Sequence, residues 1–334
     1  MTRASPPVSV PGVIEADVIL AAAERLRPHV KETLVERSDV LAAAAGTRET
    51  AVWLKCENLQ HTGSFKLRGA CNKILTLPPD VLARGVVTAS TGNHGRGVAH
   101  ALDVVGARGT IYLPTTASPG KLEALRRYPS VDLELYHTDS DQTEIHAREI
   151  AEESGRVYIS PYNDEDVIAG QGTIAVELAR QCPSLDAVFI AVGGGGLVSG
   201  MASYLKAIDP GIAIVGCWPE NAPSLHVALQ EGRIVSVAEK PTLSDATAGG
   251  AEPGSITFDL ARDLIDDHML VSEAEIADAI RFVLVEHHLV IEGSAGVAVA
   301  AWRKTAARYA GQSVAIVLCG GNISPEKLRT VLDD

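Results

Sequence analysis

The chain has 334 residues, which is long enough for one large domain or two ordinary ones. Of these residues 46% are hydrophobic, which is too many for a disordered chain. Its formal net charge of −13 argues against binding to nucleic acid or to an anionic membrane. Five widely spaced cysteines, without a C-x-x-C pair or an apolar signal-peptide stretch, predict a soluble, cytoplasmic protein with reduced thiols.

In chain order, the hydrophobic pattern predicts helices alternating with strands. In the first half we expect helices at 14–26, from Ser64, and at 95–105, 119–127 and 142–153, and strands at 51–56, 86–89, 110–113, 131–136 and 157–159. The pattern breaks at 161–164. In the second half we expect helices from near Gly172 to Arg180 and after 193–196, and strands at 187–192, 213–217 and 314–318. This alternation predicts an α/β fold with two open, mostly parallel sheets.

Three glycine-containing turns follow predicted strands, at 91–95, 193–196 and 319–322. Ligands of open α/β sheets bind outside the carboxyl ends of the strands. One such turn can be explained by tight packing alone, but three in one chain favour a ligand site.

The strongest local motif is the turn of Gly193, Gly194, Gly195 and Gly196, followed by Leu197, between a buried strand and a helix. Backbone N–H groups without side chains can close on a phosphate, and the helix N-terminus adds a favourable dipole. The dinucleotide fingerprint and the P-loop both require residues that are absent here, so a single phosphate on a smaller cofactor fits better. A flexible loop without a ligand is the alternative.

A second motif places Lys66 at the start of a predicted helix, after the loop Gln60–Phe65. The helix dipole disfavours a cation there, which lowers the pKa of the amine and favours the neutral nucleophile that forms a Schiff base. A solvated surface lysine is the alternative reading.

The segment 54–70, which reads LKCENLQHTGSFKLRGA, resembles the pyridoxal-phosphate (PLP) attachment signature of threonine and serine dehydratases. Segments 90–95 (STGNHG), 193–197 (GGGGL) and 319–322 (CGGN) resemble the other three motifs of that family, in the same order. The resemblance extends from about Ile14 to the end of the chain. It implies PLP fold type II, similar to the tryptophan synthase β-subunit, with a large PLP-binding domain at 1–85 and 161–334 and a small domain at 86–160.

The same resemblance implies the site residues. Lys66 would carry the cofactor as a Schiff base and move protons, and Thr91 would be a second catalytic group. The expected cofactor-binding residues are Phe65, Lys66, Asn93, Gly193, Gly194, Gly195, Gly196, Leu197, Glu292 and Cys319. The expected substrate-binding residues are Ser90, Thr91, Gly92, Asn93 and His94.

Cys319 bears on the type of reaction, because the resemblance places it beside the pyridine nitrogen. A neutral thiol there leaves the ring a weak electron sink, which suits β-elimination better than transamination. We therefore expect dehydration of a small hydroxy-amino acid, such as L-threonine or L-serine, to a 2-oxo acid and ammonia.

Two departures from the family pattern modify this expectation. Twelve residues follow Asn322, so a regulatory C-terminal domain is not expected. Trp218 and Ser224 align with the acidic ligands of metal-dependent relatives, so no metal site is expected, although Glu220 would contribute if the loop is shifted by two residues.

Several alternatives stay open on the sequence alone. They are a dehydratase of hydroxyectoine-utilisation gene sets, a serine racemase in which Thr91 reprotonates the opposite face, a β-replacement synthase, and a non-catalytic amino-acid-binding protein. The resemblance also suggests a homodimer or homotetramer.

Overall fold

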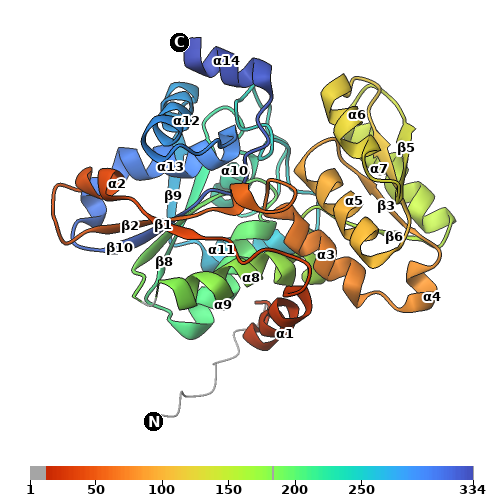
Figure 1. The fold of residues 1–334 in the computed structure, drawn as a ribbon, viewed down its shortest axis with the longest axis horizontal. Helices are drawn as coiled ribbons and strands as arrows, with labels where there is room; N and C mark the ends of the chain where they lie inside the picture. Colours follow the sequence, from red (N-terminus) through yellow and green to blue (C-terminus); the bar gives the residue numbers. More distant parts are fainter. Residues whose placement is uncertain (1–12, 183, 334) are drawn as a thin grey trace.

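The computed structural model describes residues 13–182 and 184–333, which form two β-sheets flanked by helices (Figure 1). The larger sheet has the strand order β1-β2-β10-β7-β8-β9, and all its neighbours are parallel except β1 and β2. Its strands are β1 (Val35–Arg37), β2 (Ala51–Lys55), β7 (Ala187–Ala191), β8 (Ala213–Pro219), β9 (Asp267–Val271) and β10 (Ser313–Val317). Helices cover both faces of this sheet, so every residue of β7 is buried.

The smaller sheet has four parallel strands in the order β5-β4-β3-β6 and lies to the right in Figure 1. Its strands are β3 (Val86–Ala89), β4 (Gly109–Leu113), β5 (Val131–Leu135) and β6 (Val157–Tyr158). The helices α4 (Pro79–Leu82), α5 (Asn93–Val105), α6 (Pro119–Arg126) and α7 (Ser140–Glu153) belong to this part of the molecule.

The remaining helices pack on the larger sheet or between the two sheets. They are α1 (Ala16–Leu26), α2 (Asp39–Ala43), α3 (Lys66–Thr76), α8 (Glu165–Gln181), α9 (Gly196–Ile208), α10 (Ser224–Glu231), α11 (Ile256–Leu264), α12 (Glu273–His287), α13 (Gly293–Thr305) and α14 (Pro325–Asp333), with short 3₁₀ segments at Glu57–Leu59 and Ala306–Tyr309. α3 packs against both α5 and α8, so it joins the two sheets.

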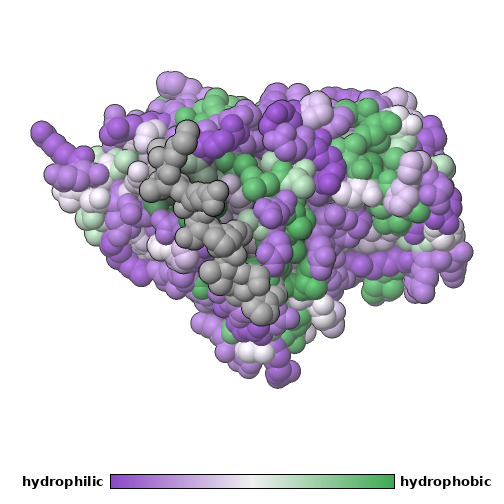
Figure 2. Space-filling model, turned by 90° about the horizontal axis from the view of Figure 1, so that it is seen from below, coloured by the Kyte–Doolittle hydropathy of each residue, from purple (hydrophilic) through white to green (hydrophobic). Residues whose placement is uncertain are grey.

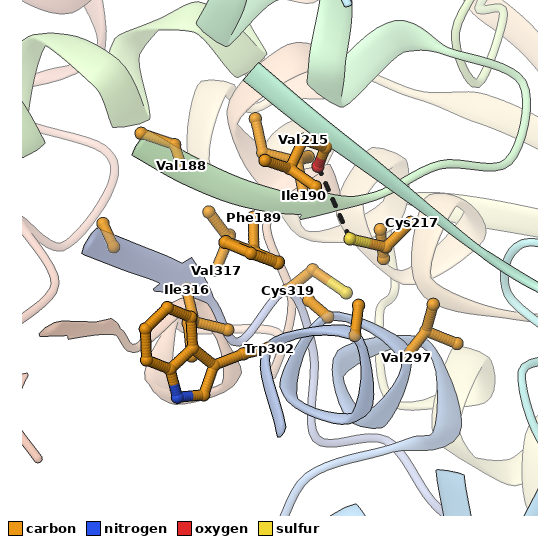
Figure 3. Close-up of a cluster of buried hydrophobic side chains, with 14 of the residues drawn as sticks. Val188, Phe189, Ile190, Val215, Cys217, Val297, Trp302, Ile316, Val317 and Cys319 are labelled. Atoms are coloured by element: carbon orange, nitrogen blue, oxygen red, sulfur yellow. Dashed lines mark hydrogen bonds between the residues drawn. The ribbon is translucent and has the colours of Figure 1, made fainter. Parts of the chain in front are cut away.

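The main hydrophobic core lies between the central strands of the larger sheet and α13 (Figure 3). The rings of Phe189 and Trp302 meet edge to face, with centroids 5.6 Å apart. The indole N–H of Trp302 donates to the carbonyl oxygen of Leu41 at 3.0 Å, so its polar atom is satisfied inside the core. Cys217 and Cys319 are also buried there as free thiols, as are the other three cysteines.

The face shown in Figure 2 is mostly hydrophilic, with separate apolar patches between the polar side chains. Within residues 13–182 and 184–333, no helix is both long and apolar enough to cross a membrane.

The predicted α/β fold with two mostly parallel sheets is confirmed, with some errors in its elements. The predicted helix start near Gly172 is wrong, because α8 begins at Glu165, where the Asp164 side chain accepts a hydrogen bond from the Val167 N–H and caps the helix. The short strands β1 and β9 were not predicted, because neither has a clear alternating pattern.

Candidate active site

The site forms where three neighbouring parallel strands end. β2, β10 and β7 are adjacent, so their carboxyl ends share one edge of the larger sheet. The backbone then joins the loop after β2 to the turn after β10: Phe65 N–H donates to the Cys319 carbonyl at 3.1 Å, and Gly321 N–H donates to the Gly63 carbonyl at 2.9 Å. Segments more than 250 residues apart in sequence thereby form one wall.

A pocket at this edge brings together most of the predicted cofactor-binding residues. Its lining comes from seven segments and comprises Phe65, Lys66, Asn93, Tyr162, Ala191, Val192, Gly193, Gly194, Gly195, Gly196, Leu197, Val198, Ala246, Thr247, Ser294 and Cys319. Among the described residues, no aspartate or glutamate lines this pocket.

Lys66 is the first residue of α3, and its Nζ donates to the carbonyl oxygen of Pro161 at 2.7 Å. Burial lowers the pKa of Lys66 to about 8, although Cys319 and Glu292 oppose the shift. A lysine with this pKa has a substantial neutral fraction near neutral pH, which is the nucleophilic form.

The glycine turn is tightly packed against neighbouring side chains and backbone. A Cβ on Gly194 would lie 2.5 Å from the Tyr162 ring, one on Gly193 would lie 2.8 Å from Thr247, and Gly195 has a φ of +89°. Only glycine fits these positions, and α9 begins at Gly196, so its free N–H groups are at the pocket. A helix N-terminus with a glycine turn binds phosphate.

Glu292 does not line the pocket but lies directly behind it. Its carboxylate accepts hydrogen bonds from Asn93 Nδ2 at 2.7 Å, from Ser294 Oγ at 2.7 Å and from Asn322 N–H at 2.9 Å. Burial raises the pKa of Glu292, and these three hydrogen bonds oppose that shift. Because the Asn93 amide is held from both ends, with Asn322 Nδ2 donating to its Oδ1 at 2.7 Å, its orientation is fixed.

Cys319 lies within the pocket wall as a neutral thiol, because burial raises its pKa to about 12. Its Sγ contacts Ser294 Oγ at 3.5 Å. A nucleophilic amine, a neutral thiol, a glycine turn at a helix N-terminus and the ring of Phe65 in one pocket suit a small aromatic phosphate.

The residues Ser90, Thr91, Gly92 and His94 lie in the turn after β3 and at the start of α5, outside the pocket lining. Burial lowers the pKa of His94 to about 3, and its Nε2 is 2.9 Å from the Ile159 carbonyl oxygen, so the imidazole is neutral. Its Nδ1 has no hydrogen-bond partner among the described residues.

The family of pyridoxal-phosphate-dependent enzymes has a sequence model that matches residues 26–320 of this chain. The chain belongs to that family. An L-threonine ammonia-lyase of Thermotoga maritima is 39% identical over 96% of this PLP-dependent enzyme and 79% of the relative. An L-threo-3-hydroxyaspartate ammonia-lyase of a Pseudomonas species is 36% identical over 94% of this chain and 97% of the relative. The structure of maize serine racemase superimposes with a TM-score of 0.88, at 31% identity over 96% and 97% of the two chains.

Three polar residues in the pocket of this PLP enzyme were not predicted, namely Tyr162, Thr247 and Ser294. Tyr162 follows Pro161, whose carbonyl oxygen accepts the hydrogen bond from Lys66, and its ring packs against Gly194 of the glycine turn. Its position in the P-Y-N-D break between predicted elements was a usable signal, because loops at the ends of strands carry functional residues. Thr247 and Ser294 lie in segments whose place next to the pocket depends on the tertiary fold.

The region around Trp218 and Ser224, where no metal site is expected, is packed with aromatic and imidazole rings. Trp218 is buried against the rings of His226 and His268, with centroid distances of 5.3 and 5.1 Å. The Ser224 hydroxyl donates to Glu239. Within the described part of the chain, no three His, Cys, Asp or Glu side chains are grouped as metal ligands. The absence of a metal stays a prediction.

The role of the glycine turn as the phosphate site stays a prediction, and a substitution in the turn tests it. We expect Gly194→Ala to weaken PLP binding about tenfold or more, because the added methyl group pushes against the Tyr162 ring and overpacking costs roughly 1–3 kcal/mol. Titration of apoprotein with PLP measures the affinity. Gly120→Ala in α6 is the matched control, since a Cβ there meets nothing within 4 Å. Equal PLP affinity in the two variants would contradict this role of the turn.

Proposed function

We propose that this PLP enzyme is an ammonia-lyase that eliminates the β-hydroxyl group of a small hydroxy-amino acid, such as L-threonine or L-serine, and yields a 2-oxo acid and ammonia. The observation that carries the proposal is the pocket itself, in which Lys66, with its lowered pKa, shares the space with the neutral thiol of Cys319 and with no carboxylate of the described residues. The L-threonine ammonia-lyase relative supports the same reaction class.

In this proposal, Gly193 to Leu197 hold the cofactor phosphate, and Phe65 packs against its ring. Asn93 contacts the cofactor through the second hydrogen of its Nδ2, since Glu292 uses the first. PLP, when bound, stabilises negative charge at the α-carbon of the substrate. The neutral thiol of Cys319 keeps that stabilisation modest, so the departure of a β-substituent competes well with other outcomes.

Lys66 is proposed to hold the cofactor and then, as a free amine, to accept the proton from the substrate α-carbon through Nζ. Ser90 to His94 are proposed to bind the substrate carboxylate, mainly through main-chain N–H groups at the start of α5. His94 orients this turn rather than transferring protons, because its imidazole is neutral and bonded to Ile159.

A substrate panel with purified holoenzyme tests the proposal. We expect steady release of 2-oxo acid and ammonia from L-threonine or L-serine and little from amino acids without a β-leaving group. A panel without any release would support the binding-protein alternative. The similarity to maize serine racemase and the hydroxyl group of Thr91 favour racemisation as a second candidate activity. Chiral analysis of the serine that remains in the same assay measures it.

The organisation is part of the same proposal. The segments 1–85 and 161–334 would form the large domain around the six-stranded sheet, and 86–160 the small domain. The family resemblance suggests a homodimer or homotetramer, and light scattering measures the oligomeric state. Five buried, free thiols support a cytoplasmic location.

A further inference from the structure

An irregular segment, residues 232–255, connects α10 to α11 and contributes to the active-site pocket. Its residues Ala246 and Thr247 belong to the pocket lining. Of the described residues that line the pocket, Ala246 alone is exposed, so the mouth of the pocket lies beside it. Long connections without secondary structure are uncommon and often serve as active-site lids. We call residues 245–254 the strap.

Both ends of the strap are fixed, whereas its middle has free space around it. Before the strap, the Leu243 N–H donates to Glu273 Oε2 at 2.6 Å. After it, the Ile256 N–H donates to Asn163 Oδ1 at 3.0 Å. Between these points Gly249 has a φ of +104°, and a Cβ on it or on the glycine that follows would meet nothing within 4 Å. Glycines tolerate large changes of backbone dihedral angles, so the strap can move while its ends stay in place.

Opposite charges hold the strap against the helices of the smaller sheet. Its two charged residues, Asp245 and Glu252, are both acidic. Glu252 Oε2 lies 2.8 Å from Arg148 Nη2 of α7. Asp245 Oδ2 lies 3.2 Å from Lys327 Nζ of α14 and 3.8 Å from Lys121 Nζ of α6. The Arg148 and Glu252 side chains are 35% and 27% exposed, and a partly exposed pair of this kind is weak enough to break and re-form.

Arg148 keeps other partners when it loses Glu252. Its Nε and Nη2 donate to Glu144 Oε1 at 3.1 and 2.8 Å, within the same helix. Its guanidinium carbon also lies 4.3 Å from the centroid of the Tyr158 ring, a cation–π contact. Because these contacts orient the side chain and pair its charge, release of Glu252 leaves Arg148 in place to bind it again.

Glu252 also joins the strap to the pocket wall. Its backbone N–H donates to Tyr162 Oη at 3.0 Å, and its Oε1 accepts a hydrogen bond from Asn163 Nδ2 at 2.5 Å. The ring of Tyr162 packs against the glycine turn, and a Cβ on Gly193 would lie 2.8 Å from Thr247 Cα. The strap therefore contacts the glycine turn both directly and through Tyr162.

We propose that the strap is a lid over the mouth of the pocket, and that Arg148 and Glu252 are positioning residues that hold it closed. The closed lid excludes water from Lys66 and keeps Tyr162 against the glycine turn. Substrate enters and product leaves beside Ala246 when the ion pair opens. The inference goes beyond the proposed reaction and is independent of which amino acid is the substrate.

Hydrogen–deuterium exchange of a peptide that spans 245–254 in the holoenzyme measures the opening of the lid. We expect Glu252→Gln and Arg148→Gln each to raise its exchange rate about two- to fivefold, as for the loss of one partly exposed ion pair. The double variant should add little, because both substitutions remove the same pair. A peptide over β7 should exchange as in the wild type, which shows that the fold is intact. Asp132→Asn, which breaks an exposed pair with Arg108 at the smaller sheet, is the matched control and should leave the strap unchanged.

Access to the cofactor distinguishes a lid from a segment that is only loosened. Hydroxylamine removes PLP from a lysine, so its rate of reaction with the holoenzyme reports how often the mouth is open. We expect this rate to rise in Glu252→Gln and Arg148→Gln by the same factor as the exchange rate. In the wild type and in Asp132→Asn it should also rise with ionic strength, because salt screens the Arg148–Glu252 pair, and the two lid variants should lose this dependence.

Unchanged exchange of the strap in both single variants overturns the inference. Faster exchange with unchanged hydroxylamine access overturns it as well, since the strap would then move without opening the pocket. Neither measurement uses turnover, so a failure of the proposed lyase function would be seen in the substrate panel and would leave both results readable.

Discussion

Replacing Lys66 by alanine is expected to lower 2-oxo acid formation ~10⁴-fold or more, because one side chain is proposed both to hold the cofactor and to move the α-proton. The visible absorption band of lysine-bound PLP should disappear in the same variant. The structure leaves no substitute amine in the pocket, since Lys66 is the only lysine in its lining among the described residues. Absorption spectroscopy and steady-state assays measure the two effects on one sample.

The matched control is Lys73→Ala on the same helix, where the lysine pairs with Asp164 and Asp166 and lies outside the pocket. This variant should keep the band and the activity. The pKa of about 8 for Lys66 adds a pH test. The neutral amine is the nucleophile, so the rate at which apoprotein captures PLP should rise as the pH approaches 8 and level off above it. A wild-type band that persists in Lys66→Ala would reject the assignment.

The second large effect is expected on stability, from Arg68→Met. Arg68 is fully buried and donates to Glu57 Oε1 and Oε2 at 2.8 Å each and to Glu177 Oε1 and Oε2 at 2.6 and 2.9 Å. Lys55, also buried, donates to Glu177 at 2.6 Å. Removal of Arg68 leaves two buried carboxylates with one cation, and breaking a buried pair costs about 3–5 kcal/mol. Urea unfolding measures the loss in the free energy of unfolding.

The pH dependence of that loss identifies its cause. Burial is the largest influence and raises the pKa of Glu57, but the charge and hydrogen bonds of Arg68, together with Lys55 and Thr33, outweigh it, so the net pKa is lowered in the wild type. A carboxyl group whose pKa is lower in the folded than in the unfolded chain stabilises the fold at pH values above its unfolded-state pKa. This contribution is lost as the pH falls through the folded-state pKa. Without Arg68, protonation of Glu57 removes the unpaired buried charge. The difference in the free energy of unfolding between the variant and the wild type should therefore narrow as the pH falls towards 4.5, the ordinary pKa of a glutamate. Arg108→Met, at an exposed pair, should change stability by no more than about 1 kcal/mol at any pH.

The sequence was sufficient for features that depend on local chemistry. Consecutive glycines after a buried strand predict a phosphate turn, and Lys66 at a helix start predicts a perturbed amine. The fold class followed from the alternation of elements. The family comparisons confirm the resemblance to PLP enzymes, and the assignment of individual site residues stays a prediction.

Features that depend on the approach of distant segments were not predictable. The hydrogen bond between Glu292 and Asn93 joins residues 199 positions apart, and no periodicity in the sequence indicates it. The Arg68 cluster was missed because buried charges look like surface charges in a sequence. A second cavity, lined in part by His61, Arg96 and Tyr128, forms where α5, α6 and the loop before α3 come together, and only the tertiary structure shows that contact.

The central position of β10 has a consequence for how the protein is made. This strand lies between β2 and β7, and the turn after it pairs with the loop before Lys66. A ribosome completes β2 and β7 long before it completes β10, so until then β2 can pair only with β1 and β7 only with β8, and the edge of each strand that faces β10 stays unpaired. Non-local pairing of this kind slows folding and exposes strand edges. The cofactor pocket therefore closes late in biogenesis, and chaperone dependence and the timing of PLP capture should both reflect the arrival of that one strand.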